Sequence, residues 1–103
     1  MEKIRLTEKA FPTEILQDIQ RAESILLDHG AVKIILYGSL ARGDYRPDSD
    51  IDLCVEGIPD KNFFRALAEI FMKIQRPVSL LDFQNLHGYL RERILREGKI
   101  LYG

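Results

Sequence analysis

Residues 36–57 read LYGSLARGDYRPDSDIDLCVEG, and this stretch determines how the fold is interpreted. An isoleucine-rich run, typical of a buried strand, ends at Gly38 and Ser39. Ten residues later, Asp50 and Asp52 stand at the start of a second apolar run. Residues two apart in a strand point to the same face, so we expect the two carboxylates to project together while their apolar neighbours face the core.

A pair of neighbouring carboxylates is electrostatically unfavourable unless a cation lies between them. Oxygen ligands favour Mg²⁺, or Mn²⁺ as the alternative, over zinc. A third acid, Asp82, lies in the apolar run Val78–Phe83. If that strand lies beside the strand of Asp50 and Asp52, the three acids could hold two ions roughly 3.5–4 Å apart, as in nucleotidyl transfer. The alternative for Asp82 is a cap for the following helix.

The Gly38-Ser39 turn predicts an anion-binding site. A strand that turns into a short helix exposes free backbone N–H groups, and glycine allows a phosphate to approach closely. Ser39 adds a hydroxyl, and Arg42, one turn later, could reach the same anion. A structural bridge from Arg42 to Asp44 or Asp50 is the alternative. An anion site beside an acidic metal site indicates a nucleoside triphosphate, although the spacing is not that of a P-loop.

Hydrophobic periodicity predicts alternating helices and strands over residues 1–103, which we expect to form a single domain. The expected elements are a helix from Thr13 to Gly30, a strand Val32–Tyr37, a helical turn Ser39–Gly43, a strand Ile51–Glu56, a helix Asp60–Gln75, a strand Val78–Phe83, a helix from Asn85 to Gly98 and a strand Ile100–Tyr102. This order predicts an α/β (α+β) fold, with a small mixed β-sheet of three to four strands flanked by helices. The mixed charges from Arg91 to Lys99 are typical of a solvated helix face.

The composition argues against several classes of protein. Lys+Arg 15 against Asp+Glu 16 gives a net charge of -1, so direct nucleic-acid binding is not expected. No apolar run approaches the roughly 20 residues of a membrane span, and the first residues lack the apolar core of a signal peptide. The one cysteine, Cys54, permits no intrachain disulfide, and we expect a cytoplasmic protein.

The segment GSLARGDYRPDSDIDL, residues 38–53, resembles the signature of the DNA polymerase beta-like nucleotidyltransferase superfamily: Gly-Ser, ten residues, Asp-x-Asp. Its form G-S-x-A-R-G…S-D-I-D-L is similar to the minimal nucleotidyltransferase (MNT) branch, and the resemblance extends to the terminal ILREGKILYG. It implies the nucleotidyltransferase fold. It also implies transfer of a nucleoside monophosphate to an acceptor hydroxyl, with release of pyrophosphate.

The resemblance also implies residue roles. Gly38 and Ser39 would hold the triphosphate, and Arg42 would contact a phosphate. Asp50 and Asp52 would bind two Mg²⁺ ions. Asp82 would complete one metal site and assist deprotonation of the attacking hydroxyl.

Minimal members are often paired with a HEPN-domain toxin, which implies an antitoxin that transfers AMP from ATP to a tyrosine of that toxin. The near-neutral charge fits a protein acceptor better than a polynucleotide. Because the chain has no residues left for a second module, we expect another copy or a partner protein to complete the pocket. Two alternatives stay open: a small-molecule (aminoglycoside-type) nucleotidyltransferase working as a homodimer, and a non-catalytic binding partner.

Overall fold

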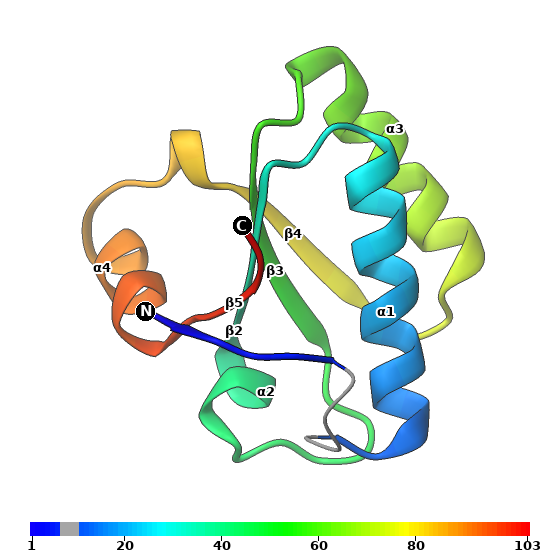
Figure 1. Ribbon diagram of the computed structural model, residues 1–103, viewed down its shortest axis with the longest axis vertical. Helices are drawn as coiled ribbons and strands as arrows, with labels where there is room; N and C mark the ends of the chain where they lie inside the picture. The colour runs from blue at the N-terminus through cyan, green and yellow to red at the C-terminus, as the bar shows by residue number, and fades with distance from the viewer. Residues whose placement is uncertain (7–10) are drawn as a thin grey trace.

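A computed structural model describes residues 1–6 and 11–103. The strands of the described part are β1 (Glu2–Lys3), β2 (Lys33–Tyr37), β3 (Ile51–Glu56), β4 (Val78–Asp82) and β5 (Lys99–Tyr102). The helices are α1 (Thr13–Asp28), α2 (Gly38–Arg42), α3 (Asp60–Lys73) and α4 (Gly88–Glu97), with a 3₁₀ turn, η1 (Phe83–Asn85). Figure 1 shows α1 and α3 on one side of the sheet and α4 on the other.

The strands form one mixed sheet in the order β1-β5-β2-β3-β4. Strand β2 runs antiparallel to both β3 and β5, whereas β3 and β4 are parallel. Consequently β2 ends, at Tyr37, at the same edge of the sheet at which β3, β4 and β5 begin. We call this edge the Tyr37 end of the sheet. Side chains from several strands meet there although they are far apart in the sequence.

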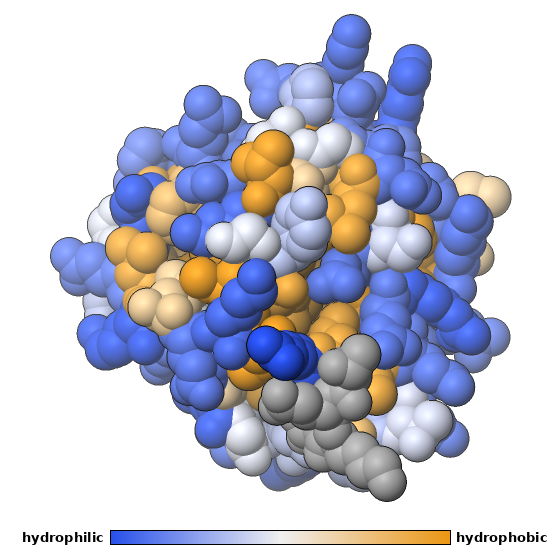
Figure 2. Space-filling model, in the orientation of Figure 1, coloured by the Kyte–Doolittle hydropathy of each residue, from blue (hydrophilic) through white to orange (hydrophobic). Residues whose placement is uncertain are grey.

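Side-chain alternation divides the sheet into two apolar faces. The larger core lies under α1 and α3 and includes Ile34, Leu36, Ile51, Leu53 and Val55, all buried. The smaller core lies under α4 and consists of Ile35, Cys54, Leu86 and Ile94. Figure 2 shows hydrophobic residues toward the middle of one face and hydrophilic residues around its rim. Because both faces of the sheet are covered by apolar cores, polar side chains of the strands can gather only at the strand ends.

The predicted mixed α/β architecture is confirmed, with two differences in detail. The sheet gains β1, a strand of 2 exposed residues whose register with β5 joins Glu2 to Lys99. So short a polar strand has no periodic pattern to reveal it. The last helix begins at Gly88 rather than near Asn85, because η1 intervenes. None of the helices in the described ranges is long and apolar enough to cross a membrane.

Candidate active site

A pocket of about 350 Å³ opens at the Tyr37 end of the sheet, between α2 and α4. Its lining comes from the end of β2, three residues of α2, the start of β3 with the residue before it, and one side of α4: Tyr37, Gly38, Ser39, Arg42, Asp50, Asp52, Leu90, Arg93, Ile94 and Glu97. Five of the six residues predicted from the sequence therefore meet in one cavity. The volume is within the range of small-molecule sites.

Gly38 and Asp52 are in close contact, and this contact shapes the pocket. Tyr37 pairs with Asp52 in the antiparallel β2–β3 ladder, so the chain leaves β2 directly beside that carboxylate. Gly38 has φ +74°, and a Cβ added there would overlap Asp52 Oδ2. Glycine is required at this turn for its backbone conformation and for the approach of the carboxylate.

The carboxylate of Asp52 is half-buried, whereas Asp50, just before β3, is exposed. Burial raises the pKa of Asp52, the negative charge of Asp50 raises it further, and Arg42 opposes both. The ionised pair is therefore unfavourable in the protein alone. A bound cation would offset both desolvation and repulsion.

The donor set fits one kind of divalent ion site. Mg²⁺ is commonly bound by one or two carboxylates together with substrate phosphates and water. Asp50 and Asp52 supply the two carboxylates, and a phosphate held at the Gly38-Ser39 turn would supply further oxygens. Within residues 1–6 and 11–103, no group of three or more His, Cys, Asp or Glu side chains could hold a metal ion. The site fits an ion shared with a phosphate, and it does not fit a cage of three protein carboxylates.

The prediction that Asp82 joins this cluster is wrong in its geometry. In the parallel β3–β4 ladder, Asp82 is in register with Val55, and Ser79 is in register with Asp52. Asp82 lies three positions beyond Ser79 in the strand, about 10 Å along the sheet. Asp82 instead caps η1: its Oδ1 accepts from the Gln84 backbone N–H at 3.1 Å, the alternative considered from the sequence. Strand β4 does lie beside β3, the condition on which the three-acid cluster depended, but its register places Asp82 away from Asp52.

Ser79 is the residue of β4 that lies at the Tyr37 end. Burial raises the pKa of Tyr37, and a side-chain hydrogen bond with Ser79 works in the opposite direction. The position of β4 in register with Asp52 therefore carries a hydroxyl rather than a carboxylate.

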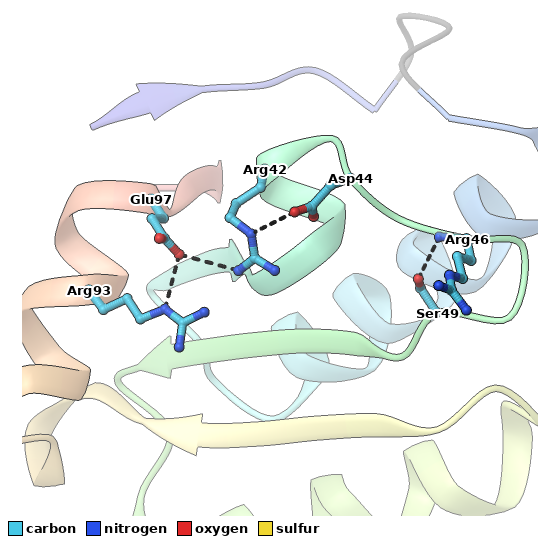
Figure 3. Close-up of polar contacts among 6 residues, drawn as sticks. All are labelled: Arg42, Asp44, Arg46, Ser49, Arg93 and Glu97. Atoms are coloured by element: carbon cyan, nitrogen blue, oxygen red, sulfur yellow. Dashed lines mark hydrogen bonds and ion pairs between the residues drawn. The ribbon is translucent and has the colours of Figure 1, made fainter.

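Arg42 takes part in an ion-pair network across the pocket (Figure 3). Its Nε lies 3.3 Å from Asp44 Oδ2, which is the bridge anticipated from the sequence. Its Nη1 lies 3.4 Å from Glu97 Oε2 on α4, and Arg93 Nε lies 3.3 Å from that same oxygen. The two guanidinium groups thus converge on one carboxylate oxygen, and both line the pocket.

Arg76 anchors the loop between α2 and β3 through hydrogen bonds. Its Nη1 donates to the carbonyl oxygens of Pro47 and Ser49, each at 2.8 Å, and its Nε donates to Asp18 Oδ2 at 3.1 Å. The Arg76 side chain is only 11% exposed. Because Ser49 precedes Asp50, these bonds fix the segment that carries the first carboxylate into the pocket.

Four residues of this arrangement were not predicted: Arg93, Glu97, Ser79 and Arg76. Arg93 and Glu97 are four apart on α4 and look like an ordinary solvated pair. Only the packing of α4 beside α2 brings them to the pocket. Arg76 precedes the proline before β4 and Ser79 is the second residue of that strand, and nothing in the sequence marks either as part of a site. Their roles follow from register and loop geometry.

Comparison with known proteins identifies the family of the chain. Residues 16–103 match the family described as "Polymerase beta, Nucleotidyltransferase". A Methanocaldococcus jannaschii protein named "putative protein adenylyltransferase" is 34% identical over 70 residues, which make up 68% of this chain and 54% of that protein. The chain thus spans about half the length of this relative.

Solved structures share the fold. One described as a "putative minimal nucleotidyltransferase" has 31% identity and a TM-score of 0.61, covering 88% of this chain and 97% of that one. A chain from the complex of a tri-AMPylated Shewanella oneidensis HEPN toxin with its MNT antitoxin has 20% identity and a TM-score of 0.66, covering 88% and 73%. With the Gly-Ser turn and the two carboxylates in one pocket, the match over residues 16–103 shows that the chain belongs to the polymerase beta nucleotidyltransferase family.

Proposed function

We propose that this protein transfers AMP from ATP to a hydroxyl of a partner protein, with Mg²⁺ bound by Asp50 and Asp52. One observation carries the proposal. The Gly38-Ser39 turn, Arg42 and the two carboxylates line the same pocket, although ten residues separate Ser39 from Asp50. An anion-binding turn beside a carboxylate pair suits a triphosphate that arrives with a divalent ion.

In the proposed reaction, this chain binds and orients the donor. Ser39 donates its hydroxyl hydrogen to a phosphate oxygen, and Arg42 donates to the same phosphate chain. Gly38 keeps the turn free of a side chain, so the phosphate approaches the backbone closely. Mg²⁺, when bound, supplies positive charge to the phosphate oxygens and the leaving pyrophosphate.

The bond changes balance without any further reactant. The acceptor oxygen forms a bond to the α-phosphorus as the bond from that phosphorus to the bridging oxygen of the β-phosphate breaks. The products are the adenylated acceptor, pyrophosphate and one proton released to water. Catalysis of this kind comes mainly from positioning and from electrostatic stabilisation of the charge that moves to the leaving group.

The acceptor we propose is a tyrosine of a HEPN-type toxin, which would make this chain an antitoxin. Two comparisons support this choice: the relative named as a protein adenylyltransferase, and the fold neighbour in complex with an AMPylated HEPN toxin. The near-neutral charge, -1 overall, also suits a protein acceptor. Because the proposed reaction consumes ATP, we propose that the protein acts in the cytoplasm.

The test uses the full chain, ATP labelled on the α-phosphate, MgCl₂ and the protein product of the adjacent open reading frame, which we expect to be of the HEPN type. We expect label on that protein, a mass increase of one AMP, and localisation to a tyrosine by peptide mass spectrometry. Asp52→Asn and EDTA should each abolish labelling. A γ-labelled ATP control should leave the acceptor unlabelled, because the γ-phosphate leaves in pyrophosphate.

The same assay separates the two alternatives. Label on an aminoglycoside but not on the protein would indicate a small-molecule enzyme, and a dimer in solution would then be expected. Complex formation with the HEPN-type protein without any transfer would indicate a non-catalytic partner. The lack of a three-carboxylate cluster among the described residues makes this last control necessary.

A further inference from the structure

The pocket has two walls of opposite charge. Asp50 and Asp52 lie on one side, at the start of β3, and Arg42 and Arg93 lie on the other, on α2 and α4. A metal–polyphosphate complex has the same polarity, since its cation and its phosphate oxygens lie on different sides. The acidic wall is accounted for by the proposed metal site. The basic wall has an additional member, Arg93, to which no role has yet been assigned.

Arg93 is well placed to bind an anion and is only partly engaged. Its Nε is 3.3 Å from Glu97 Oε2, and its terminal amino groups make no hydrogen bond within the described residues. A guanidinium group has five N–H donors in a planar fork, which suits phosphate oxygens. The side chain is 44% exposed, so a ligand in the pocket can reach it.

Glu97 lies between Arg42 and Arg93, the position that an anion bound by both arginines would take. The single oxygen Oε2 accepts from both Arg42 Nη1 at 3.4 Å and Arg93 Nε at 3.3 Å (Figure 3). Charge-assisted bonds of this type are commonly about 2.7–2.9 Å long, so both contacts are loose. A shared, loosely held carboxylate can be replaced by a phosphate, which carries more charge and more acceptor oxygens.

We propose that Arg93 is a second phosphate-binding residue, and that Glu97 is a resident counter-anion which the bound polyphosphate displaces from Arg42 and Arg93. The inference rests on the proposed function, because the polyphosphate is that of the nucleotide donor. In the free protein, Glu97 keeps two like charges close together on the rim of the pocket. In the bound protein, both guanidinium groups turn to the phosphates.

Binding of inorganic pyrophosphate with MgCl₂, measured by calorimetry, tests the proposal, because pyrophosphate contains only the group in question. Arg93→Ala should weaken binding by about tenfold or more, the loss expected for a charge-assisted hydrogen bond. Arg93→Lys should recover part of it. Arg96→Ala is the matched control: it removes the same charge from the same helix, and Arg96 does not line the pocket. It should bind as the wild type does.

Glu97→Gln tests displacement separately. Removing the competing charge while keeping both arginines should strengthen pyrophosphate binding by about two- to fivefold, the range expected of one exposed ion pair. Weaker binding in this variant would overturn the role of Glu97 as a displaced counter-anion. In the transfer assay, Arg93→Ala should raise KM for ATP more than it lowers kcat.

The outcomes distinguish this inference from the proposed function. If the wild type binds neither pyrophosphate nor ATP, the proposed function fails. If the wild type binds both and Arg93→Ala binds equally well, only the inference about Arg93 fails. Equal losses in Arg93→Ala and Arg96→Ala would show a general effect of net charge and would also overturn it. A cooperative thermal transition without ligand, above the temperature of the binding assay, confirms that each variant is folded.

Discussion

Asp52 on β3 lies in register with Ser79 on β4, whereas Asp82 lies in register with Val55, toward the other end of the sheet. The parallel ladder therefore places a hydroxyl, not a carboxylate, beside the proposed metal ligand. The Asp82 carboxylate accepts a hydrogen bond from the backbone N–H of Gln84 in η1. The pocket offers two carboxylates to a metal ion, Asp50 and Asp52, since its third, Glu97, is paired with Arg42 and Arg93. We expect the remaining metal ligands to come from phosphates and water.

Replacing Asp82 should affect stability more than transfer. Asp82→Ala removes the acceptor of the Gln84 N–H, and losing a cap of this kind costs about 1 kcal/mol. Denaturant unfolding should show that loss, while transfer activity measured well below the melting temperature stays within about twofold. A loss of activity comparable with that of Asp52→Asn would contradict our placement of Asp82 outside the site.

Introducing a carboxylate at Ser79 should complete a three-acid site. Ser79→Asp places the new group on the strand next to Asp52, since adjacent strands lie about 4.8 Å apart. The Mg²⁺ concentration for half-maximal activity should fall by about tenfold, and the metal-free protein should melt at a lower temperature because a third like charge is added. Ser79→Asn, of similar shape but uncharged, should leave the Mg²⁺ dependence unchanged. A Mg²⁺ titration identical to that of the wild type would be evidence against the register we describe.

Asp52→Asn should remove activity and stabilise the protein at the same time. Burial and the charge of Asp50 both disfavour the ionised carboxylate of Asp52. The amide removes that penalty, so the melting temperature without ligand should rise, while transfer falls by about a hundredfold or more for want of a metal ligand. Mg²⁺ with ATP should raise the melting temperature of the wild type and have little effect on the variant. A lower melting temperature for the variant without ligand would contradict our inference that the ionised Asp52 carboxylate destabilises the metal-free protein.

Arg76 should influence activity without touching the pocket. Arg76→Ala leaves the carbonyls of Pro47 and Ser49 without their donor, and we expect a stability loss of about 2–3 kcal/mol. Because the loop carries Asp50, activity should fall by about tenfold even where the variant is fully folded. Arg21→Ala is the control, since Arg21 pairs with the same Asp18 at 3.5 Å and has no hydrogen bond to that loop in the described structure. Equal effects of the two variants would argue that only the ion pair with Asp18 matters.

The network around Glu97 predicts a pH dependence. Burial works to raise the pKa of Glu97, but hydrogen bonds from Arg93 and Arg42 outweigh it and lower the pKa below the usual value. A carboxyl whose pKa is lower in the folded protein contributes stability above its unfolded pKa of about 4.3, and this contribution is lost as the pH falls through the folded value. The difference in unfolding midpoint between wild type and Glu97→Gln should therefore shrink below about pH 4. A difference that stays constant from pH 7 down to pH 3 would contradict the ion pairs.

The elements and half of the site were predictable from the sequence because they depend on local patterns. Isoleucine-rich runs, helical periodicity and the Gly38-Ser39 break predict the strands and helices of the described chain, apart from β1. The i, i+2 rule places Asp50 and Asp52 together whatever the rest of the fold does. Gly38, Ser39 and Arg42 follow because the turn and the helix that contain them are continuous in sequence.

Strand register and helix packing were decided only by the tertiary structure. A three-residue shift along the β3–β4 ladder, which would bring Asp82 rather than Ser79 beside Asp52, would turn every β4 side chain to the opposite face. Because β4 has apolar residues for both faces, Leu80 in the larger core and Leu81 against the smaller one, the sequence alone did not exclude that register. Arg93 and Glu97 look like ordinary solvent-exposed residues of α4 in the sequence, and only the packing of α4 beside α2 brings them to the pocket. Arg76 bonds to backbone carbonyl oxygens, and no sequence pattern indicates which carbonyls a side chain will reach. Local chemistry thus determined which groups can bind a metal and a phosphate. Long-range packing determined which of them share one pocket.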